Sequence, residues 1–305
     1  MLGATSDNVA MVATTTNNFA GAPGVRAQFW NDMVTGVSAL TSVTDQTGAG
    51  VVDGSSVPMG INFIQAGGGS RFNNTASPGN NEARMFNGVF DNFENGTSVF
   101  EATNIPFASY NVYCYARPDA GGSFRGGFFY VTNTAAKKWI KGGTASGVTI
   151  ALPDNNGGGY VESSTTTPPT TFAQISAGHF VSFKNVTGST LRVEMSAVGA
   201  GAGGVLDGDG ARRHKVVGFQ IVEVPSSGTA TNLSLGSAIP SLLGGNPVGF
   251  QLMVIGTYDE GFAYPVSTLQ TISYASENPS VFSVNSSGSI APLNPGTANL
   301  VVTFT

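Results

Sequence analysis

Hydrophobic and polar residues alternate along many short segments of this 305-residue chain. The clearest segment is 191–198, in which the apolar positions Leu191, Val193, Met195 and Ala197 alternate with Arg192, Glu194 and Ser196. A period of two indicates a strand with one buried and one solvated face. Comparable runs predict strands at 8–13, 111–116, 127–132, 147–152 and 179–183, whereas only 81–87 has a helical pattern.

Clusters of Gly, Pro and Asn separate these segments at the spacing expected of a β-sandwich or jelly roll. A break falls at 225–231, between a predicted closing strand at 215–224 and an opening strand at 232–235. We therefore predict an all-β protein. It comprises a jelly-roll-like β-sandwich over residues 1–224, a linker over 225–231, and a smaller sandwich over 232–305.

The last 75 or so residues carry three connected motifs. They are Gly-Thr-Tyr-Asp-Glu-Gly at 256–261, Tyr-Ala-Ser-Glu-Asn-Pro-Ser-Val at 274–281, and Ser-Gly-Ser-Ile-Ala-Pro-Leu-Asn-Pro-Gly-Thr-Ala at 287–298. This region resembles the bacterial Ig-like domain of group 2, although Tyr274 stands where that family often has Trp. The resemblance implies an Ig-like β-sandwich that serves as a spacer or adhesive module in extracellular proteins.

Shorter motifs mark the first region: 84–91 (Arg-Met-Phe-Asn-Gly-Val-Phe-Asp), 110–115 (Tyr-Asn-Val-Tyr-Cys-Tyr) and 217–222 (Val-Gly-Phe-Gln-Ile-Val). In this order they are similar to sandwich modules of bacterial surface proteins. Those modules in turn resemble galactose-binding-like and carbohydrate-binding jelly rolls. The resemblance implies a glycan-binding fold and carries no ligand residues over to this chain.

The charge, the cysteine content and the length of the apolar runs exclude or disfavour several classes of function. Only 10% of residues are charged and the net charge is −5, which disfavours binding to nucleic acid. Cys114 is the only cysteine, which excludes an internal disulfide and a cysteine-based zinc site. No apolar run is long enough for a membrane span. We expect an extracellular or cell-surface protein. The favoured interpretation is that an export signal preceded this sequence, and the alternative is release by another route, such as with a virus particle.

Two places favour ligand binding. Lys137 and Trp139 lie in a run with three lysines, where the indole could stack on a sugar and a lysine could pair with a uronate or sulfate. The alternative is a core Trp139 beside lysines that protect a strand edge. Arg117, Phe124 and Arg125 flank or end a loop that a jelly roll could place at its rim.

Asp207 and Asp209 place two carboxylates in a glycine-rich turn, which makes calcium the candidate cofactor. An EF-hand beginning at Asp207 is excluded because Gly218 stands where that loop needs Glu. A solvated turn is the alternative. His179 and His214, the two histidines, are interpreted as structural. The Gly-x-Gly-x-x-Gly run at 199–204 precedes a strand, so it does not predict a dinucleotide site.

These observations predict a non-catalytic module that binds a glycan or surface polymer and is presented by an Ig-like spacer. One alternative is a structural subunit of a filament, sheath or virion surface, whose partners are copies of itself. A weaker alternative is a glycan-cleaving enzyme, which would need two carboxylates facing each other across a cleft.

Overall fold

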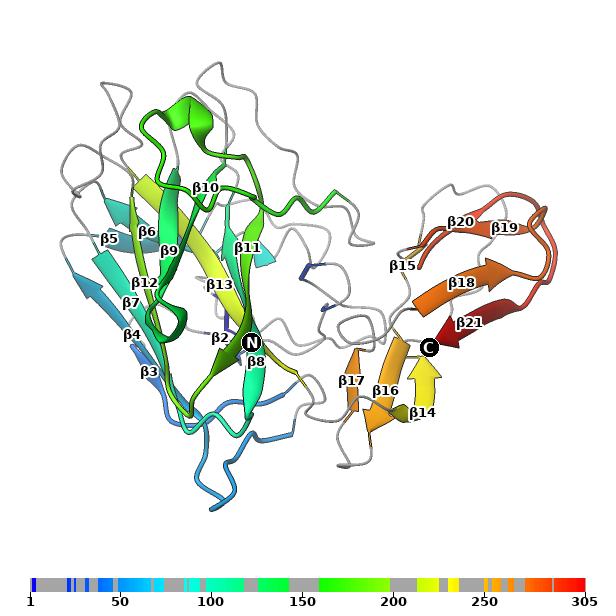
Figure 1. The fold of residues 1–305 in the computed structure, drawn as a ribbon, viewed down its shortest axis with the longest axis horizontal. Coiled ribbons are helices and arrows are strands. Elements are labelled where there is room, and N and C mark those ends of the chain that lie inside the picture. Colours follow the sequence, from blue (N-terminus) through cyan, green and yellow to red (C-terminus); the bar gives the residue numbers. More distant parts are fainter. Residues whose placement is uncertain are drawn as a thin grey trace.

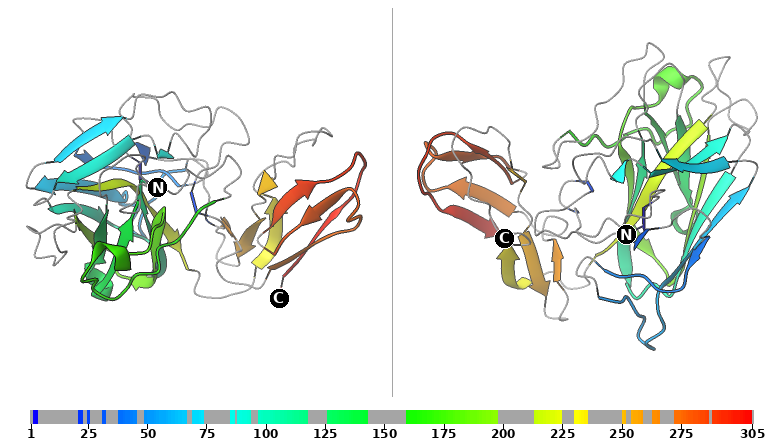
Figure 2. Two further views of the ribbon diagram at one scale, coloured as in Figure 1. Left: turned by 90° about the horizontal axis from the view of Figure 1, so that it is seen from above. Right: turned by 180° about the vertical axis from the view of Figure 1, so that it is seen from behind.

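The structure is a computed structural model of the whole chain. It describes residues 2–3, 21–22, 25, 31–32, 38–45, 49–66, 69–73, 85–86, 88–93, 97–117, 126–142, 159–197, 213–224, 230–235, 250–251, 254–258, 263–265, 272–286 and 288–304. This part is built almost entirely of β-strands, which confirms the all-β prediction. Strands β1–β13 gather in a larger lobe and β14–β21 in a smaller one (Figure 1), and the further views agree (Figure 2).

The first sheet of the larger lobe has the strand order β11-β8-β13-β1-β2, and β6 pairs with β13 and β5. Its pairs are antiparallel except β1 with β2. The described bounds are β1 Leu2–Gly3, β2 Asn31–Asp32, β5 Gly69–Asn73, β6 Gly88–Phe93, β8 Ser109–Ala116, β11 Phe180–Thr187 and β13 Arg213–Glu223.

The second sheet is antiparallel throughout, in the order β10-β9-β12-β7-β4-β3. Its strands are β3 Ala39–Leu40, β4 Gly60–Ala66, β7 Thr97–Thr103, β9 Gly126–Val131, β10 Ala136–Lys141 and β12 Leu191–Ala197. A 3-10 helix, η1 (Thr132–Thr134), joins β9 to β10, and η2 (Phe172–Gln174) precedes β11. From β7 onward the chain repeatedly changes sheets, as jelly rolls do.

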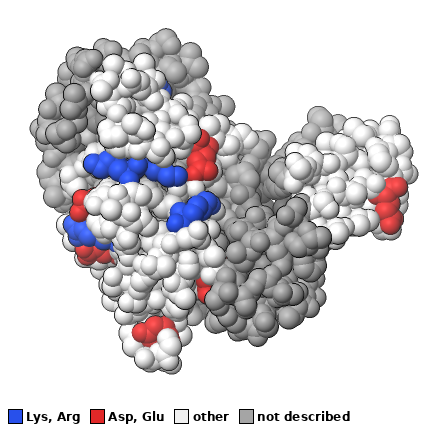
Figure 3. All heavy atoms as spheres, viewed as in Figure 1, with Lys and Arg blue, Asp and Glu red and all other residues white. Residues whose placement is uncertain are grey.

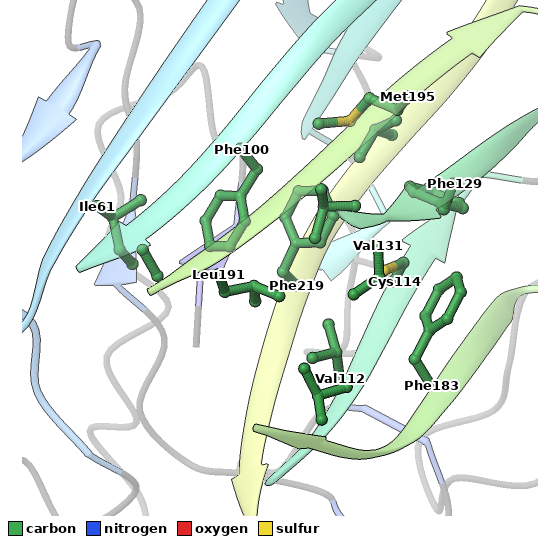
Figure 4. Close-up of a cluster of buried hydrophobic side chains, with 14 of the residues drawn as sticks. Ile61, Phe100, Val112, Cys114, Phe129, Val131, Phe183, Leu191, Met195 and Phe219 are labelled. Atoms are coloured by element: carbon green, nitrogen blue, oxygen red, sulfur yellow. The ribbon is translucent and has the colours of Figure 1, made fainter. Parts of the chain in front are cut away.

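The two sheets pack face to face over one apolar core (Figure 4). Phe100 of the second sheet stacks on Phe219 of the first, with ring centroids 4.3 Å apart. Phe129 meets the same ring edge to face at 6.0 Å, and Phe63 lies 4.1 Å from Phe90. Such aromatic pairs stabilise the fold beyond the contribution of the area they bury. Because the two sheets pack face to face over this shared core, the larger lobe is a β-sandwich.

The predicted alternation at 191–198 is confirmed in β12 over 191–195, whereas Ser196, which the pattern placed on the solvated face, is 3% exposed and its hydroxyl lies 2.8 Å from that of Thr97. Leu191, Val193 and Met195 are at most 1% exposed, and Ala197 is fully buried. Arg192 and Glu194 point away from the core and are half-buried. The strand predictions at 111–116, 127–132, 179–183 and 215–224 correspond to β8, β9, β11 and β13. The strands predicted at 8–13 and 147–152 lie outside the described residues.

A second apolar cluster covers the outer face of the first sheet. It includes Met85 and Phe86, which come from the segment predicted to be helical and are at most 2% exposed. The described part of that segment is helical at Met85 and turns at Phe86. The Tyr115 hydroxyl accepts a hydrogen bond from the Ala22 backbone nitrogen at 2.9 Å, which ties an early segment onto the sheet.

In the smaller lobe the described strands form three small antiparallel sheets, ordered β14-β16-β17, β15-β20-β19 and β18-β21. They comprise β14 Ala230–Leu235, β15 Phe250–Gln251, β16 Val254–Tyr258, β17 Ala263–Pro265, β18 Ile272–Ser276, β19 Phe282–Val284, β20 Ser289–Pro292 and β21 Leu300–Phe304. Phe282 and Ile290 are buried at the centre of a cluster that Tyr274 borders.

One turn of this lobe lies at 285–288, where the sequence Asn-Ser-Ser-Gly is typical of a hairpin turn. The Gly288 backbone nitrogen donates to the Asn285 carbonyl at 2.9 Å, and the Ser289 nitrogen donates to the Asn285 side chain at 2.9 Å. Gly288 has φ +81, a conformation that glycine adopts without a steric cost. Its α-carbon lies against the Tyr274 ring, which a Cβ would approach to 2.9 Å.

Candidate functional site

The best candidate site is the outer face of the second sheet. We call it the open face, and define it by the outward side chains of β7, β9, β10 and β12: Glu101, Phe128, Tyr130, Lys137, Arg192 and Glu194. None of these six residues is fully buried. In a strand whose alternate residues fill the core, the intervening residues point outward. The same periodicity that builds the sandwich therefore positions this face.

Strand register places Tyr130 in the middle of the open face. Tyr130 of β9 lies opposite Lys137 on β10 and opposite Glu194 on β12. Neighbouring strands are about 4.8 Å apart, so a cation and a carboxylate flank the phenol ring on its two sides. Tyr130 is half-buried, and among the described residues its hydroxyl has no hydrogen-bond partner. The ring and its hydroxyl can therefore both be offered to a ligand.

Lys137 rests on aromatic rings. Its ammonium lies 4.1 Å from the centroid of Phe128, 5.7 Å from that of Tyr130 and 6.0 Å from that of Trp139. Cations are attracted to the negative faces of such rings. This contact holds the exposed Lys137 side chain down on the sheet, next to Tyr130.

Arg192 connects the two carboxylates of the open face. Its guanidinium donates to Glu194 at 3.1 Å and also contacts Glu101 on the next strand. The hydrogen bond to Glu194, followed by the one to Glu101, raises the pKa of Arg192. All three side chains stay 32–42% exposed, so the network is accessible to solvent and to a ligand. Exposed ion pairs of this kind add little to stability.

One end of the open face is closed by η2. Trp139 packs there with Phe172 and Ile175, and Phe128 borders this cluster. The Lys141 ammonium donates to the backbone carbonyls of Phe172 and Ala173 at 3.1 and 3.2 Å. Burial lowers the pKa of Lys141. The segment around η2 is thus fixed to β10 and forms a wall at this end.

The structure brings two of the predicted ligand residues, Lys137 and Trp139, to the same face of β10. Trp139 is only 7% exposed, and its ring belongs to the η2 cluster. This burial favours the interpretation of Trp139 as a core residue. A bridge to Thr165 also covers the strand edge at Trp139, where the backbone nitrogen donates to the Thr165 carbonyl at 3.0 Å.

The other predicted site residues are not on the open face. Arg117 follows β8 in the first sheet, where its backbone nitrogen donates to the Lys215 carbonyl at 2.9 Å. Phe124, Arg125 and the two candidate calcium ligands, Asp207 and Asp209, lie outside the described residues. Within the described ranges no group of three or more His, Cys, Asp or Glu side chains could hold a metal ion.

Both histidines are buried. His179 has no exposed surface, and its Nδ1 accepts a hydrogen bond from the Val161 backbone nitrogen at 3.0 Å. His214 is 1% exposed and lies edge-on to Phe129, with ring centroids 4.7 Å apart. Burial lowers the pKa of His214 to about 3. These surroundings agree with a structural role for each imidazole.

Sequence reasoning singled out Lys137 but not Tyr130, which lies opposite it. The alternation along 191–198 did show that Arg192 and Glu194 point to solvent. The pairing of Tyr130 with Lys137 and with Glu194 depends on register between strands that are far apart in the chain. The available signal was weak: an aromatic residue at a polar-side position of a predicted strand.

The charges of the larger lobe are sparse and unevenly distributed (Figure 3). On the face shown, a stripe of basic side chains crosses a surface that is otherwise mostly uncharged. At one side of the lobe, basic and acidic side chains lie next to one another. No described helix is long and apolar enough to cross a lipid bilayer.

No family model matches the sequence. No curated protein matches it either. Among solved structures, exo-β-1,3-galactanase from Phanerochaete chrysosporium with β-1,3-galactotriose is 14% identical. That match covers 51% of this chain and 27% of the galactanase chain, with a TM-score of 0.26. The same enzyme with galactose is 14% identical over 59% of this chain and 31% of that one, with a TM-score of 0.23.

Xanthan lyase from Paenibacillus is 10% identical, and the match covers 86% of this chain and 25% of the lyase, with a TM-score of 0.27. This chain therefore spans between a quarter and a third of the length of these proteins. At these identities and TM-scores, the likeness assigns neither a family nor a function.

Proposed function

We propose that this protein is a non-catalytic extracellular module that binds a glycan or a similar surface polymer on the open face of its larger sandwich. The observation that carries the proposal is the row Lys137–Tyr130–Glu194, in which an accessible aromatic ring lies between two hydrogen-bonding groups of opposite charge. A sugar ring has an apolar C–H face and a polar rim. An aromatic ring can cover the first while the flanking groups bind the second.

The Arg192 network supports binding in preference to bond cleavage. Glu101 and Glu194 are the carboxylates of the open face, and both contact the same guanidinium. A glycosidase needs one carboxyl group to donate a proton and a second one facing it across the glycosidic bond. Two carboxylates that share an arginine are arranged to orient a hydroxyl-rich ligand.

The smaller lobe is proposed to act as a spacer of the bacterial Ig-like type. The turn at 285–288 and the strands beside it support this assignment, because they lie in the region that carries the resemblance. A spacer would present the open face away from the surface to which the protein is attached.

The test is a glycan array combined with a substitution at the centre of the row. Wild-type protein is expected to bind one glycan class. Tyr130→Leu should weaken that binding at least about tenfold, because it removes the flat ring while leaving the half-buried position apolar. Tyr130→Phe separates the contribution of the hydroxyl from that of the ring. Val57→Ser, an exposed position far from the face in sequence, is the control.

Three companion measurements cover the alternatives. Light scattering after size exclusion should show no ordered polymer. Reducing-end assays should show no cleavage of the bound glycan. Repeating the array in EDTA tests the predicted calcium turn at Asp207 and Asp209. Polymers together with a silent array would overturn the proposal in favour of a structural subunit, and cleavage would overturn it in favour of an enzyme.

A further inference from the structure

Lysine is concentrated on one strand of this acidic protein. The net charge is −5, yet three of the five lysines, Lys137, Lys138 and Lys141, lie on β10. Each of these lysines either makes a structural contact within the protein or leaves its ammonium group available to a ligand.

Two of the three lysines have structural contacts. Lys141 is 7% exposed, and its ammonium is bonded to the carbonyls of Phe172 and Ala173. Lys138 has the opposite orientation along β10, so its side chain leans to the core side, and its ammonium lies 5.7 Å from the ring of Phe183 on the first sheet. It covers the edge of the sandwich between β10 and β11. Neither of these ammonium groups belongs to the open face.

Lys137 differs from both. Its side chain is exposed, and within the described residues its ammonium has neither an ion-pair nor a hydrogen-bond partner. Its contacts are with ring faces, at 4.1 Å from Phe128 and 5.7 Å from Tyr130. The ammonium therefore keeps its hydrogen-bond donors while its position beside Tyr130 is fixed.

The nearby carboxylates do not neutralise it. Glu194 lies on the far side of Tyr130 from Lys137, and its side chain contacts Arg192. Glu101 is one strand further away and contacts the same guanidinium. At that end of the row one guanidinium faces two carboxylates, so the end is net negative, whereas the exposed Lys137 ammonium has no ion-pair partner among the described residues.

Building on the proposed function, we infer that the glycan bound on the open face is anionic, with its carboxylate or sulfate group paired to Lys137 while its sugar ring lies on Tyr130. The Glu194–Arg192–Glu101 end binds hydroxyl groups of the next sugar. A neutral glycan would offer the Lys137 ammonium hydroxyl acceptors but would leave its positive charge uncompensated. An anionic sugar supplies the opposite charge as well as the acceptor.

The experiment compares polymers that differ only in charge. Polygalacturonate is compared with its fully methyl-esterified form, and dextran sulfate with dextran, by affinity electrophoresis and calorimetry on the full chain. Wild-type protein should bind at least one charged member more tightly than its uncharged match. Raising the salt from about 50 to 300 mM should reduce the difference, because exposed charge pairs are screened. Tighter binding of polygalacturonate than of its methyl ester identifies a carboxylate as the group that Lys137 binds. Tighter binding of dextran sulfate than of dextran identifies a sulfate.

Substitutions locate the effect. Lys137→Met keeps the long apolar stem and should remove most of the charge preference, which for one exposed pair is about 1.4- to fivefold in affinity. Lys137→Arg should retain it. Lys138→Met makes the same change in net charge on the same strand and should leave the preference in place.

Each outcome separates this inference from the proposed function. An equal preference for the charged polymers in wild type and Lys137→Met would overturn the assignment to Lys137. Equal or tighter binding of neutral glycans, abolished by Tyr130→Leu, would overturn the anionic ligand and leave the glycan-binding proposal standing. Binding to neither charged nor neutral glycans would overturn both.

Discussion

His214 is an ionisable side chain enclosed by the core. Within the described residues neither ring nitrogen has a hydrogen-bond partner, and burial lowers its pKa from 6.5 to about 3. The folded protein therefore keeps this imidazole neutral at pH values where an unfolded chain would protonate it. A buried cation without a partner is costly, which is the physical cause of the shift.

This shift predicts how stability depends on pH. Between pH 6.5 and about 3 the unfolded state binds a proton at His214 that the folded state does not. The free energy of unfolding should therefore fall as the pH falls through this window, by about 1.4 kcal/mol per pH unit from this group. Above pH 6.5 the contribution should be constant. Urea denaturation at pH 7, 5.5 and 4.5 measures it.

His214→Leu is the matched comparison, because leucine cannot titrate and the substitution removes no hydrogen bond among the described residues. The carboxylates titrate in both proteins, so the difference between the two curves isolates His214. The variant should lose less stability on acidification than wild type does. Parallel curves would show that His214 is protonated in the folded state or solvated.

At the scale of the elements, β9 is fitted closely against its neighbours at Gly127. A Cβ at this position would lie 2.3 Å from His214 Cγ and 2.4 Å from the Ser196 backbone oxygen. The Ser196 oxygen belongs to β12, which pairs with β9, so it cannot withdraw without opening the sheet. Glycine is required there because another strand and a buried ring approach the backbone.

Gly127→Ala should therefore destabilise the protein by about 1–3 kcal/mol, the usual cost of overpacking a well-filled interior. Gly54→Ala is the control, because a Cβ there meets no atom within 4 Å. It should change stability by no more than about 0.5 kcal/mol. Thermal and urea unfolding of both variants provide the measurement, and equal effects would contradict the close approach at Gly127.

At the scale of the whole molecule, the described strands divide into two sets. No described sheet contains strands from both sides of the 225–229 segment. The core of the larger lobe draws on both of its own sheets, and it encloses Cys114, which has no exposed surface. Burial raises the pKa of the Cys114 thiol well above its ordinary value. An inaccessible thiol with a raised pKa reacts slowly.

These features predict that residues 1–224 fold without residues 232–305. In this fragment, Cys114 should stay unreactive toward a thiol reagent in buffer and react fully in denaturant, as in the full chain. Its urea midpoint should match that of the corresponding transition in the full chain. Rapid labelling of Cys114 in the fragment without denaturant would show that the larger lobe depends on the smaller one.

The burial of individual residues shows which features a local sequence pattern can predict and which it cannot. The alternation at 191–198 identified the buried apolar side chains of β12, because the period of two is a property of a single strand, but it did not show that Ser196 is buried as well. The turn at Asn285–Gly288 was also visible, because turn chemistry depends on adjacent residues. The sequence could not decide whether Trp139 is a core residue or an exposed ligand-binding one, because the η2 segment that covers it lies 33 or more positions away in the chain.

The all-β class, the sandwich and the exclusion of an internal disulfide therefore followed from the sequence by itself, because composition and periodicity act within each strand. Only the tertiary structure decided that Tyr130 lies between Lys137 and Glu194, that His214 is enclosed, and that Gly127 is crowded. Each of these depends on which distant strands pair and in which register. Packing over the whole core sets that register, and a shift of one residue would turn every side chain of the open face inward.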